Sequence, residues 1–128
     1  MRIHHTGIIV RNLAKSIGMY EKLGFKKESE ITEDEQQQNR ILFMYRTEDG
    51  FRIELIEKMN ERSSVIHFNP GVHHICYEVE NPVGFEDEFR KMKIGKIFTK
   101  PMKAPAIRGR QVVFAYLLDG SLAEFLLQ

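Results

Sequence analysis

A duplication in the chain repeats histidines and glutamates, and these are the residue types of a metal site. A His-His pair near the start recurs 69 positions later, and a glutamate that follows an Asp-Gly pair recurs 70 positions later. Imidazole nitrogens and carboxylate oxygens bind divalent ions such as Ni²⁺, Co²⁺, Mn²⁺, Zn²⁺ and Fe²⁺. We therefore predict two half-sites that meet around one divalent metal ion. The candidate ligands are His4 or His5, His73 or His74, Glu54 and Glu124.

The two glutamates lie in the middle of apolar strand patterns, at residues 52–56 and 122–126. A buried carboxylate without a positive partner costs several kcal/mol or is driven to protonate. A single His or Glu in a strand is more often an ordinary core or surface residue. Four of them in register are much harder to explain by chance, and a bound metal ion would supply the positive charge.

Each copy of the repeat is predicted to form a βαβββ module. In the first, residues 3–10 form a strand, and Asn12 caps a helix that runs to about Leu23, with Gly24 at its end. The second copy is expected to follow the same plan. There Asn81 would cap the helix, Pro82 would be its first residue, Phe85, Phe89 and Met92 would form its apolar stripe, and Gly95 would end it.

Three strand-like segments follow each predicted helix, with an Asp-Gly hairpin signal before the last. The fold class is therefore α+β, in one domain that spans residues 1–128. Module one covers about 1–58, a linker covers 59–71, and module two covers about 72–128. The predicted segments are 25–32, 40–46 and 51–57 in module one, and 96–99, 111–117 and 121–127 in module two.

Two polar stretches, Glu33–Asn39 and Lys100–Arg110, are predicted to be loops over a site. The second is rich in cations, and Arg108 and Arg110 are candidates for contact with an anionic group of a substrate. Most of the cations in such a loop are expected to face solvent.

Bulk composition excludes several function classes. The chain has 128 residues, a formal net charge of +1 and one cysteine, Cys76. The charge gives no reason to expect nucleic acid as a partner, and no apolar run is long enough to cross a membrane. The opening residues form a strand pattern without the regions of a signal peptide. We expect a cytoplasmic protein with a reduced thiol.

The repeated His and Glu residues, together with residues 71–79 and 108–114, resemble the vicinal oxygen chelate superfamily, which includes glyoxalase I, methylmalonyl-CoA epimerase, bleomycin-resistance proteins and extradiol dioxygenases. The resemblance covers essentially the whole chain. It implies an eight-stranded, partly open barrel-like sheet with helices outside. By the family pattern His5, Glu54, His74 and Glu124 are the metal ligands, and His4 and His73 face the helices.

The resemblance also implies a metal-dependent lyase or isomerase that removes a proton next to a carbonyl. Glu124 is the expected base, with Glu54 as its partner. An epimerase needs a second acid/base group, and the epimerase pattern puts Gln36 there, or Glu35 with a shift of one residue. The substrate is a small molecule with vicinal oxygens, such as a thioester or a hemithioacetal. A homodimer is expected, with the site within one chain or across the dimer interface.

Two other readings compete with this one. A small-molecule binding protein of the bleomycin-resistance type would sequester a ligand without catalysis, and such proteins usually lack the four ligands. An iron-dependent dioxygenase would hold its ion with two His and one carboxylate, so the second glutamate counts against it.

Overall fold

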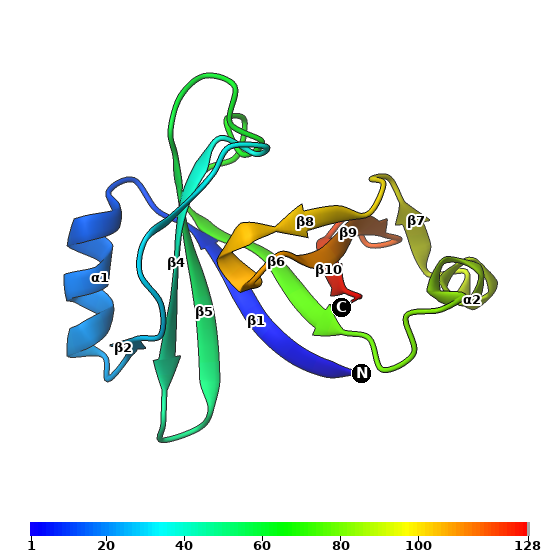
Figure 1. Cartoon of the computed structure of the whole chain (residues 1–128), viewed down its shortest axis with the longest axis horizontal. Helices are drawn as coiled ribbons and strands as arrows, with labels where there is room; N and C mark the ends of the chain where they lie inside the picture. The colour runs from blue at the N-terminus through cyan, green and yellow to red at the C-terminus, as the bar shows by residue number, and fades with distance from the viewer. Residues whose placement is uncertain (128) are drawn as a thin grey trace. The chain divides into compact units, whose positions relative to one another are not determined.

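A computed structural model describes residues 1–127 and divides them into two compact units. The first unit is His5–His73, and the second combines Met1–His4 with the chain from His74 onward. Figure 1 shows the elements of both units in the colours of the chain. The break at residues 73–74 lies close to the start of the second copy of the repeat, whereas the first four residues group with the second unit.

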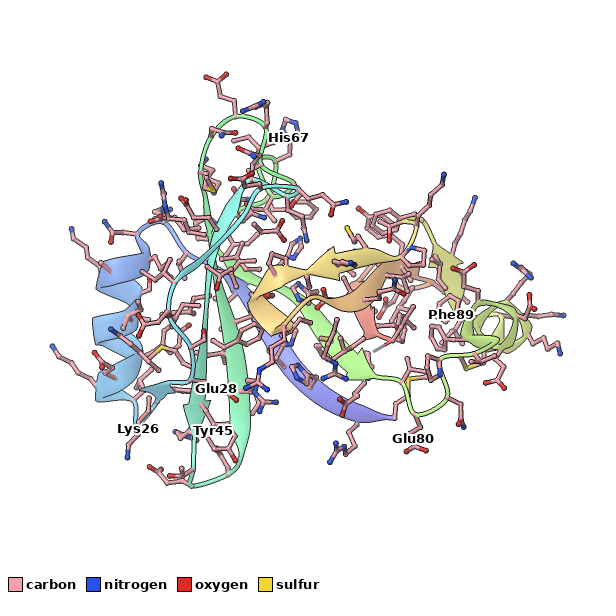
Figure 2. The ribbon with its side chains drawn as sticks, viewed as in Figure 1. Lys26, Glu28, Tyr45, His67, Glu80 and Phe89 are labelled. Atoms are coloured by element: carbon pink, nitrogen blue, oxygen red, sulfur yellow. The ribbon has the colours of Figure 1, made fainter. Side chains whose placement is uncertain are left out.

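The first unit contains a half-sheet with the strand order β2-β4-β5-β1, and β3 also pairs with β4. β1 and β5 run parallel, whereas the β4–β5, β2–β4 and β3–β4 pairs are antiparallel. At the outer strand, Lys26 lies opposite Tyr45 (Figure 2). The strands are β1 (Arg2–Ile9), β2 (Lys26–Lys27), β3 (Thr32–Asp34), β4 (Asn39–Arg46) and β5 (Phe51–Lys58).

Helix α1 (Leu13–Lys22) covers one face of this half-sheet, as its apolar spacing predicts. Leu13 and Ile17 are buried in a cluster with side chains of β4 and β5. The side chain of Asn12 accepts a hydrogen bond from the backbone N–H of Lys15 at 3.0 Å, and the cap prediction is confirmed. Gly24 follows the helix with a φ of +94°, also as predicted.

The second unit repeats the arrangement, with the strand order β6-β10-β9-β7 and β8 also paired with β9. β6 and β10 run parallel, as β1 and β5 do. The strands are β6 (Gly71–Glu78), β7 (Gly95–Ile97), β8 (Met102–Ala104), β9 (Arg110–Leu117) and β10 (Leu122–Leu126), and a 3₁₀ turn, η1, spans Pro105–Ile107.

Helix α2 (Phe85–Met92) is shorter than the sequence pattern predicts. Its N-cap is Gly84, with a φ of +77°, so the predicted start at Pro82 with an Asn81 cap is wrong. The helix ends at Met92, and its C-cap Lys93 adopts a left-handed conformation, so the helix stops before Gly95. Phe89 is buried on the sheet side of α2 (Figure 2), as predicted. Met92 is 44% exposed and does not belong to the apolar stripe, because the helix ends with it.

The α+β class and the duplicated module are confirmed, but the described residues contain ten strands instead of the predicted eight. The additional strands, β3 and β8, come from the two stretches predicted to be loops. Each has three residues: β3 is polar, and β8 is partly exposed. They form because their backbone groups pair with the long strands β4 and β9. Over residues 1–127 neither half-sheet closes on itself. Neither α1 nor α2 has the length and apolar character needed to cross a membrane.

Candidate metal centre

In the first unit, His5 and Glu54 form a buried pair. The Nε2 of His5 lies 3.4 Å from Oε1 of Glu54, and the His5 side chain is 1% exposed. The parallel register of β1 and β5 places Gly7 opposite Glu54. Since alternate residues of a strand share a face, His5 and Glu54 project to the same side of the half-sheet. The two predicted ligands of module one are therefore neighbours.

In the second unit, His74 and Glu124 form the corresponding pair. The Nε2 of His74 lies 3.2 Å from Oε1 of Glu124, with the side chains 2% and 6% exposed. Cys76 stands opposite Glu124 in the parallel β6–β10 pair, which puts His74, Cys76 and Glu124 on one face. Duplication of the sequence has thus produced two half-sites with the same construction.

A phenylalanine completes each half-site. Phe43 lies opposite Glu54 in the β4–β5 ladder, and Phe114 lies opposite Glu124 in the β9–β10 ladder. Each ring packs edge-on against the histidine of its own unit, with ring centroids 5.0 Å apart in the first unit and 5.6 Å in the second. These apolar walls exclude water from the polar atoms, which strengthens their interaction with a charged ligand.

The spacing within each pair fits two neighbouring ligands of one ion. Donors held at about 2.1 Å from an ion, with an angle of about 90–109° between them, lie roughly 3.0–3.4 Å apart. The His5–Glu54 and His74–Glu124 distances of 3.4 and 3.2 Å fall in this range. Neutral imidazole and carboxylate are also a suitable donor set for divalent transition metals. Each half-site is therefore competent to contribute two ligands.

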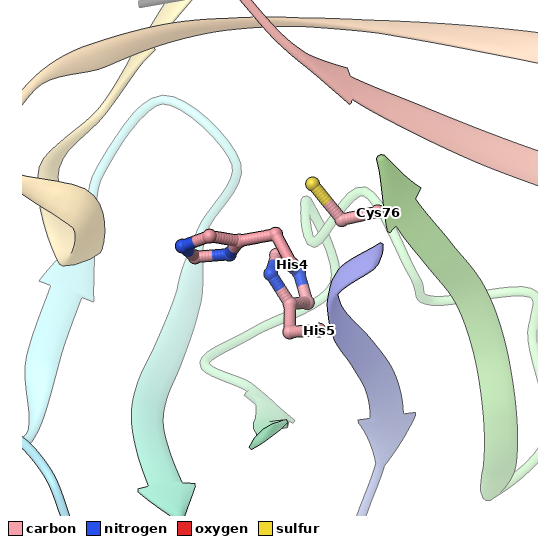
Figure 3. Close-up of side chains that lie close together, drawn as sticks. All are labelled: His4, His5 and Cys76. Atoms are coloured by element: carbon pink, nitrogen blue, oxygen red, sulfur yellow. The ribbon is translucent and has the colours of Figure 1, made fainter. Parts of the chain in front are cut away.

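The first member of each His-His pair occupies different surroundings. Both are partly exposed, in contrast to the buried His5 and His74. The ring of His73 packs edge-on against Phe68, with the centroids 4.7 Å apart. A ring nitrogen of His4 and the Sγ of Cys76 lie within 4.8 Å of each other in the second unit (Figure 3). Of each His-His pair, the buried second member is the one beside a glutamate.

The chain's cysteine belongs to the core. Cys76 is fully buried in a cluster with Val112, Phe114 and Leu126. It therefore lines the inner side of the second half-sheet close to Glu124, and its main contribution is packing.

A third carboxylate of the first unit was missed by the sequence analysis. Asp34 is only 2% exposed, whereas Glu35 and Gln36 are both exposed. The assignment of Gln36 or Glu35 to the second acid/base position stays a prediction, and Asp34 is the buried carboxylate of this stretch. Asp34 ends β3 opposite Asn39, and this pairing turns its side chain inward while the next two residues form the exposed turn. The sequence Thr32-Glu33-Asp34 is polar throughout and gives no signal of this burial.

Asp34 lies on the same face as the His5–Glu54 pair. Asp34 is paired with Asn39 of β4, and Asn39 is paired with Lys58 of β5. Lys58 is four residues from Glu54 in β5, so all of these side chains project to the same face of the half-sheet. Burial raises the pKa of Asp34, and the negative charge of Glu54 raises it further, while hydrogen bonds from the turn oppose the shift. The protonated form of the Asp34 carboxyl group is therefore favoured more than in a solvent-exposed aspartate.

The two predicted substrate cations lie near the start of β9. Arg110 is paired with Glu78 at 2.9 Å, and Arg2 approaches the same carboxylate at 2.8 Å. These two guanidinium groups lower the pKa of Glu78 to about 2. Arg108 ends the 3₁₀ turn with a φ of +60°. Arg110 is therefore held by an ion pair beside a cavity of about 360 Å³. That cavity is lined by Arg2, Glu78, Val79, Glu80, Pro82, Arg110 and Leu127.

Comparison with known proteins identifies a relative that matches over nearly its whole length. The chain is 30% identical over 131 residues to the ethylmalonyl-CoA/methylmalonyl-CoA epimerase of Cereibacter sphaeroides, and the match covers 96% of this chain and 95% of that protein. Among solved structures, the hypothetical protein BH1468 from Bacillus halodurans has a TM-score of 0.82 and is 26% identical, covering 98% of this chain and 92% of that one.

Solved epimerases share the fold at lower sequence identity. Methylmalonyl-CoA epimerase from Mycobacterium tuberculosis matches with a TM-score of 0.83 and 20% identity, over 97% of this chain and 85% of that one. The Streptomyces coelicolor enzyme in complex with 2-nitronate-propionyl-CoA has a TM-score of 0.81 and 22% identity, over 98% and 96% of the two chains. The family model described as the glyoxalase/bleomycin resistance protein/dioxygenase superfamily matches residues 4–114. The chain therefore belongs to the glyoxalase/bleomycin resistance protein/dioxygenase superfamily.

Proposed function

We propose that the protein is a metal-dependent isomerase that epimerises a 2-substituted acyl-CoA thioester by moving a proton at the carbon next to the thioester carbonyl. The observation that carries this proposal is the repeated buried pair, His5 with Glu54 and His74 with Glu124. The epimerase relative from Cereibacter sphaeroides supports a CoA thioester of the methylmalonyl type as the substrate.

The two half-sites are proposed to hold one divalent ion between them, with His5, Glu54, His74 and Glu124 as ligands. The His Nε2 to Glu Oε1 distances support this, because both fit adjacent positions around an ion. When bound, the ion supplies positive charge against the negative charge that develops on the substrate oxygens. Ni²⁺, Co²⁺, Mn²⁺, Zn²⁺ and Fe²⁺ all suit this donor set.

Glu124 is proposed as the base that removes the proton, with Glu54 as its partner. Epimerisation requires a proton to leave one face of the carbon and another to arrive on the opposite face, so a second acid/base group is needed. We assign this role to Asp34, in place of Gln36 or Glu35. Its burial on the face of the His5–Glu54 pair and its raised pKa support the assignment.

Solvent-deuterium exchange tests the proposal. The purified protein is analysed for bound metal, loaded with Ni²⁺, Co²⁺ or Mn²⁺, and incubated in D₂O with methylmalonyl-CoA or with a hemithioacetal. Deuterium should enter the thioester at C2 with inversion of configuration, and Glu124→Gln should abolish the exchange. Glu88→Gln, on the exposed side of α2, is the matched control.

Other outcomes of this experiment identify other activities. Turnover of the hemithioacetal alone would indicate a glyoxalase I-type lyase, and tight binding without exchange would indicate a binding protein. Exchange without inversion would mean a single base and would exclude the role assigned to Asp34. Sedimentation of the loaded protein tests the predicted homodimer.

A further inference from the structure

The segment between the two modules is hydrogen-bonded to the hairpin turn that follows Asp34. Backbone bonds join Ser64 N–H to the carbonyl of Gln37 at 2.9 Å and Met59 N–H to the carbonyl of Gln38 at 2.9 Å. Val65 anchors the same segment, because it packs with Ile9 and Ile56 in a buried apolar cluster. This segment, residues 59–70, is therefore fixed against the turn that follows Asp34.

Side chains continue the connection from the linker segment to Asp34. Asn39 Nδ2 donates to Ser64 Oγ at 3.1 Å, and Ser64 Oγ donates to Gln37 Oε1 at 3.0 Å. Gln37 contacts the Asp34 carboxylate twice, through its backbone N–H at 3.0 Å and through Nε2 at 3.4 Å. The amide of Gln37 thus lies between a hydroxyl of the linker and the carboxylate.

We call the hydrogen-bonded chain Asn39–Ser64–Gln37–Asp34 the relay. The direction of each hydrogen bond in it is determined by the neighbouring bonds. Ser63 Oγ accepts from Val65 N–H at 3.1 Å and donates to Asn39 Oδ1 at 2.5 Å, which turns Asn39 Nδ2 towards Ser64. Ser64 Oγ accepts a hydrogen bond from Asn39 Nδ2 and donates its own hydrogen to Gln37 Oε1. The opposite end of the Gln37 amide, Nε2, then faces Asp34. A chain with one consistent direction is stronger and more rigid than isolated bonds.

We propose that Ser64 of the linker is a positioning residue, which acts through Gln37 to hold the Asp34 carboxylate in the orientation needed for proton transfer. The inference rests on the acid/base role proposed for Asp34. Its consequence is that the segment between the modules contributes to the site. Without the Ser64 hydroxyl, the Gln37 amide loses the contact that sets its orientation, and the carboxylate loses a fixed donor.

Three substitutions test this role. Ser64→Ala removes the hydroxyl, Ser64→Thr restores it at an exposed position where an added methyl group has room, and Gln37→Met keeps the side-chain length without the amide. Gln36→Ala is the matched control, because Gln36 is exposed in the same turn and is not a link in the relay. We expect Ser64→Ala and Gln37→Met to lower kcat by about ten- to a hundredfold. KM should change by no more than about twofold, because the substrate is still bound.

A second measurement does not depend on turnover. The ¹⁵N signals of the Gln37 side-chain amide should move in Ser64→Ala and return in Ser64→Thr. Unchanged kcat and unchanged amide signals in Ser64→Ala would overturn the inference, as would a fall in kcat that Ser64→Thr does not restore. If the wild type exchanges no deuterium, the proposed function fails, and the amide signals still decide whether Ser64 orients Gln37.

Discussion

Asp34 and Glu54 place two carboxylates on one face of the first half-sheet, and the charge of Glu54 raises the pKa of Asp34. The first cause of the shift is burial, since Asp34 is 2% exposed. Hydrogen bonds from the turn keep the carboxyl group in place but do not cancel the effect of burial. Asp34 therefore holds the turn through its hydrogen bonds and also places a second buried carboxylate beside Glu54.

Asp34→Asn is expected to reduce epimerisation by about 10² to 10⁴-fold, the usual contribution of a positioned acid or base. Asparagine keeps an acceptor oxygen for Gln37 N–H, so the turn should remain. The folded-state pKa of Asp34 is raised, so the ionised carboxylate costs stability at neutral pH and the variant should melt at the same or a higher temperature. Metal content should be unchanged.

Glu35→Gln is the control for this variant, because Glu35 is the neighbouring carboxylate and is exposed. It should retain wild-type turnover. If Asp34→Asn were fully active while Glu35→Gln lost activity, Glu35 and not Asp34 would be the acid/base residue.

Metal uptake should distinguish the two members of the first His-His pair. His5→Ala removes the nitrogen that lies 3.4 Å from Glu54, and we expect bound Ni²⁺ or Co²⁺ to fall by at least about tenfold after dialysis. His4→Ala changes the partly exposed neighbour and should leave uptake intact. Metal analysis of the two variants and of the His5→Ala/His74→Ala double variant measures this directly. Equal uptake by His5→Ala and the wild type would exclude His5 as a ligand.

The sequence predicted the features that depend on periodicity and duplication. The buried His5, Glu54, His74 and Glu124 follow from two repeats with alternating strands, and α1 follows from an apolar stripe with a clear Asn12 cap. Asp34 could not be predicted in the same way. Its burial depends on a three-residue strand that pairs with β4, a contact that local composition does not encode.

The start of α2 shows a second limit of the sequence. Asn81 and Pro82 have the residue types of a helix start, but Gly84 adopts a positive φ of 77° and sets the start at Phe85. Gly84 can do this because it has no Cβ, and two apolar side chains, Phe85 and Phe89, then reach the core. The helix therefore begins after Gly84 and not after Asn81, because this start packs Phe85 and Phe89 into the core.

The ion pairs of Glu78 with Arg2 and Arg110 predict that the stability of the protein falls at low pH. The pKa of Glu78 is about 2 in the folded protein and 4.5 in its unperturbed state. The group therefore stabilises the fold above about pH 4.5, and this contribution is lost as the pH falls towards 2. Because Arg2 is largely exposed, solvent screens the pair, and we expect the contribution to be about 1 kcal/mol.

Glu78→Gln is the test of this cluster. Urea denaturation at pH 7 and at pH 3 should show a smaller difference in unfolding free energy for the variant than for the wild type. Arg90→Gln, which breaks an exposed pair with Asp87 on α2, is the control and should change neither value by more than about 0.5 kcal/mol. An identical pH dependence in Glu78→Gln and the wild type would contradict the assignment.

Two glycines in ordinary backbone conformations should respond to alanine with opposite signs. A Cβ at Gly95 would lie 2.2 Å from the carbonyl oxygen of Tyr116, a backbone atom of the paired strand β9 that cannot move aside alone. Gly95→Ala must therefore displace β7 from β9, and we expect a loss of about 1–3 kcal/mol in the free energy of unfolding.

At Gly18, inside α1, no atom lies within 4 Å of the added Cβ. Gly18→Ala should increase stability by up to about 1 kcal/mol, because alanine has the higher helix propensity. Urea denaturation of both variants measures these changes. A destabilised Gly18→Ala would contradict the open space at Gly18, and an unaffected Gly95→Ala would contradict the close approach of Gly95 to Tyr116.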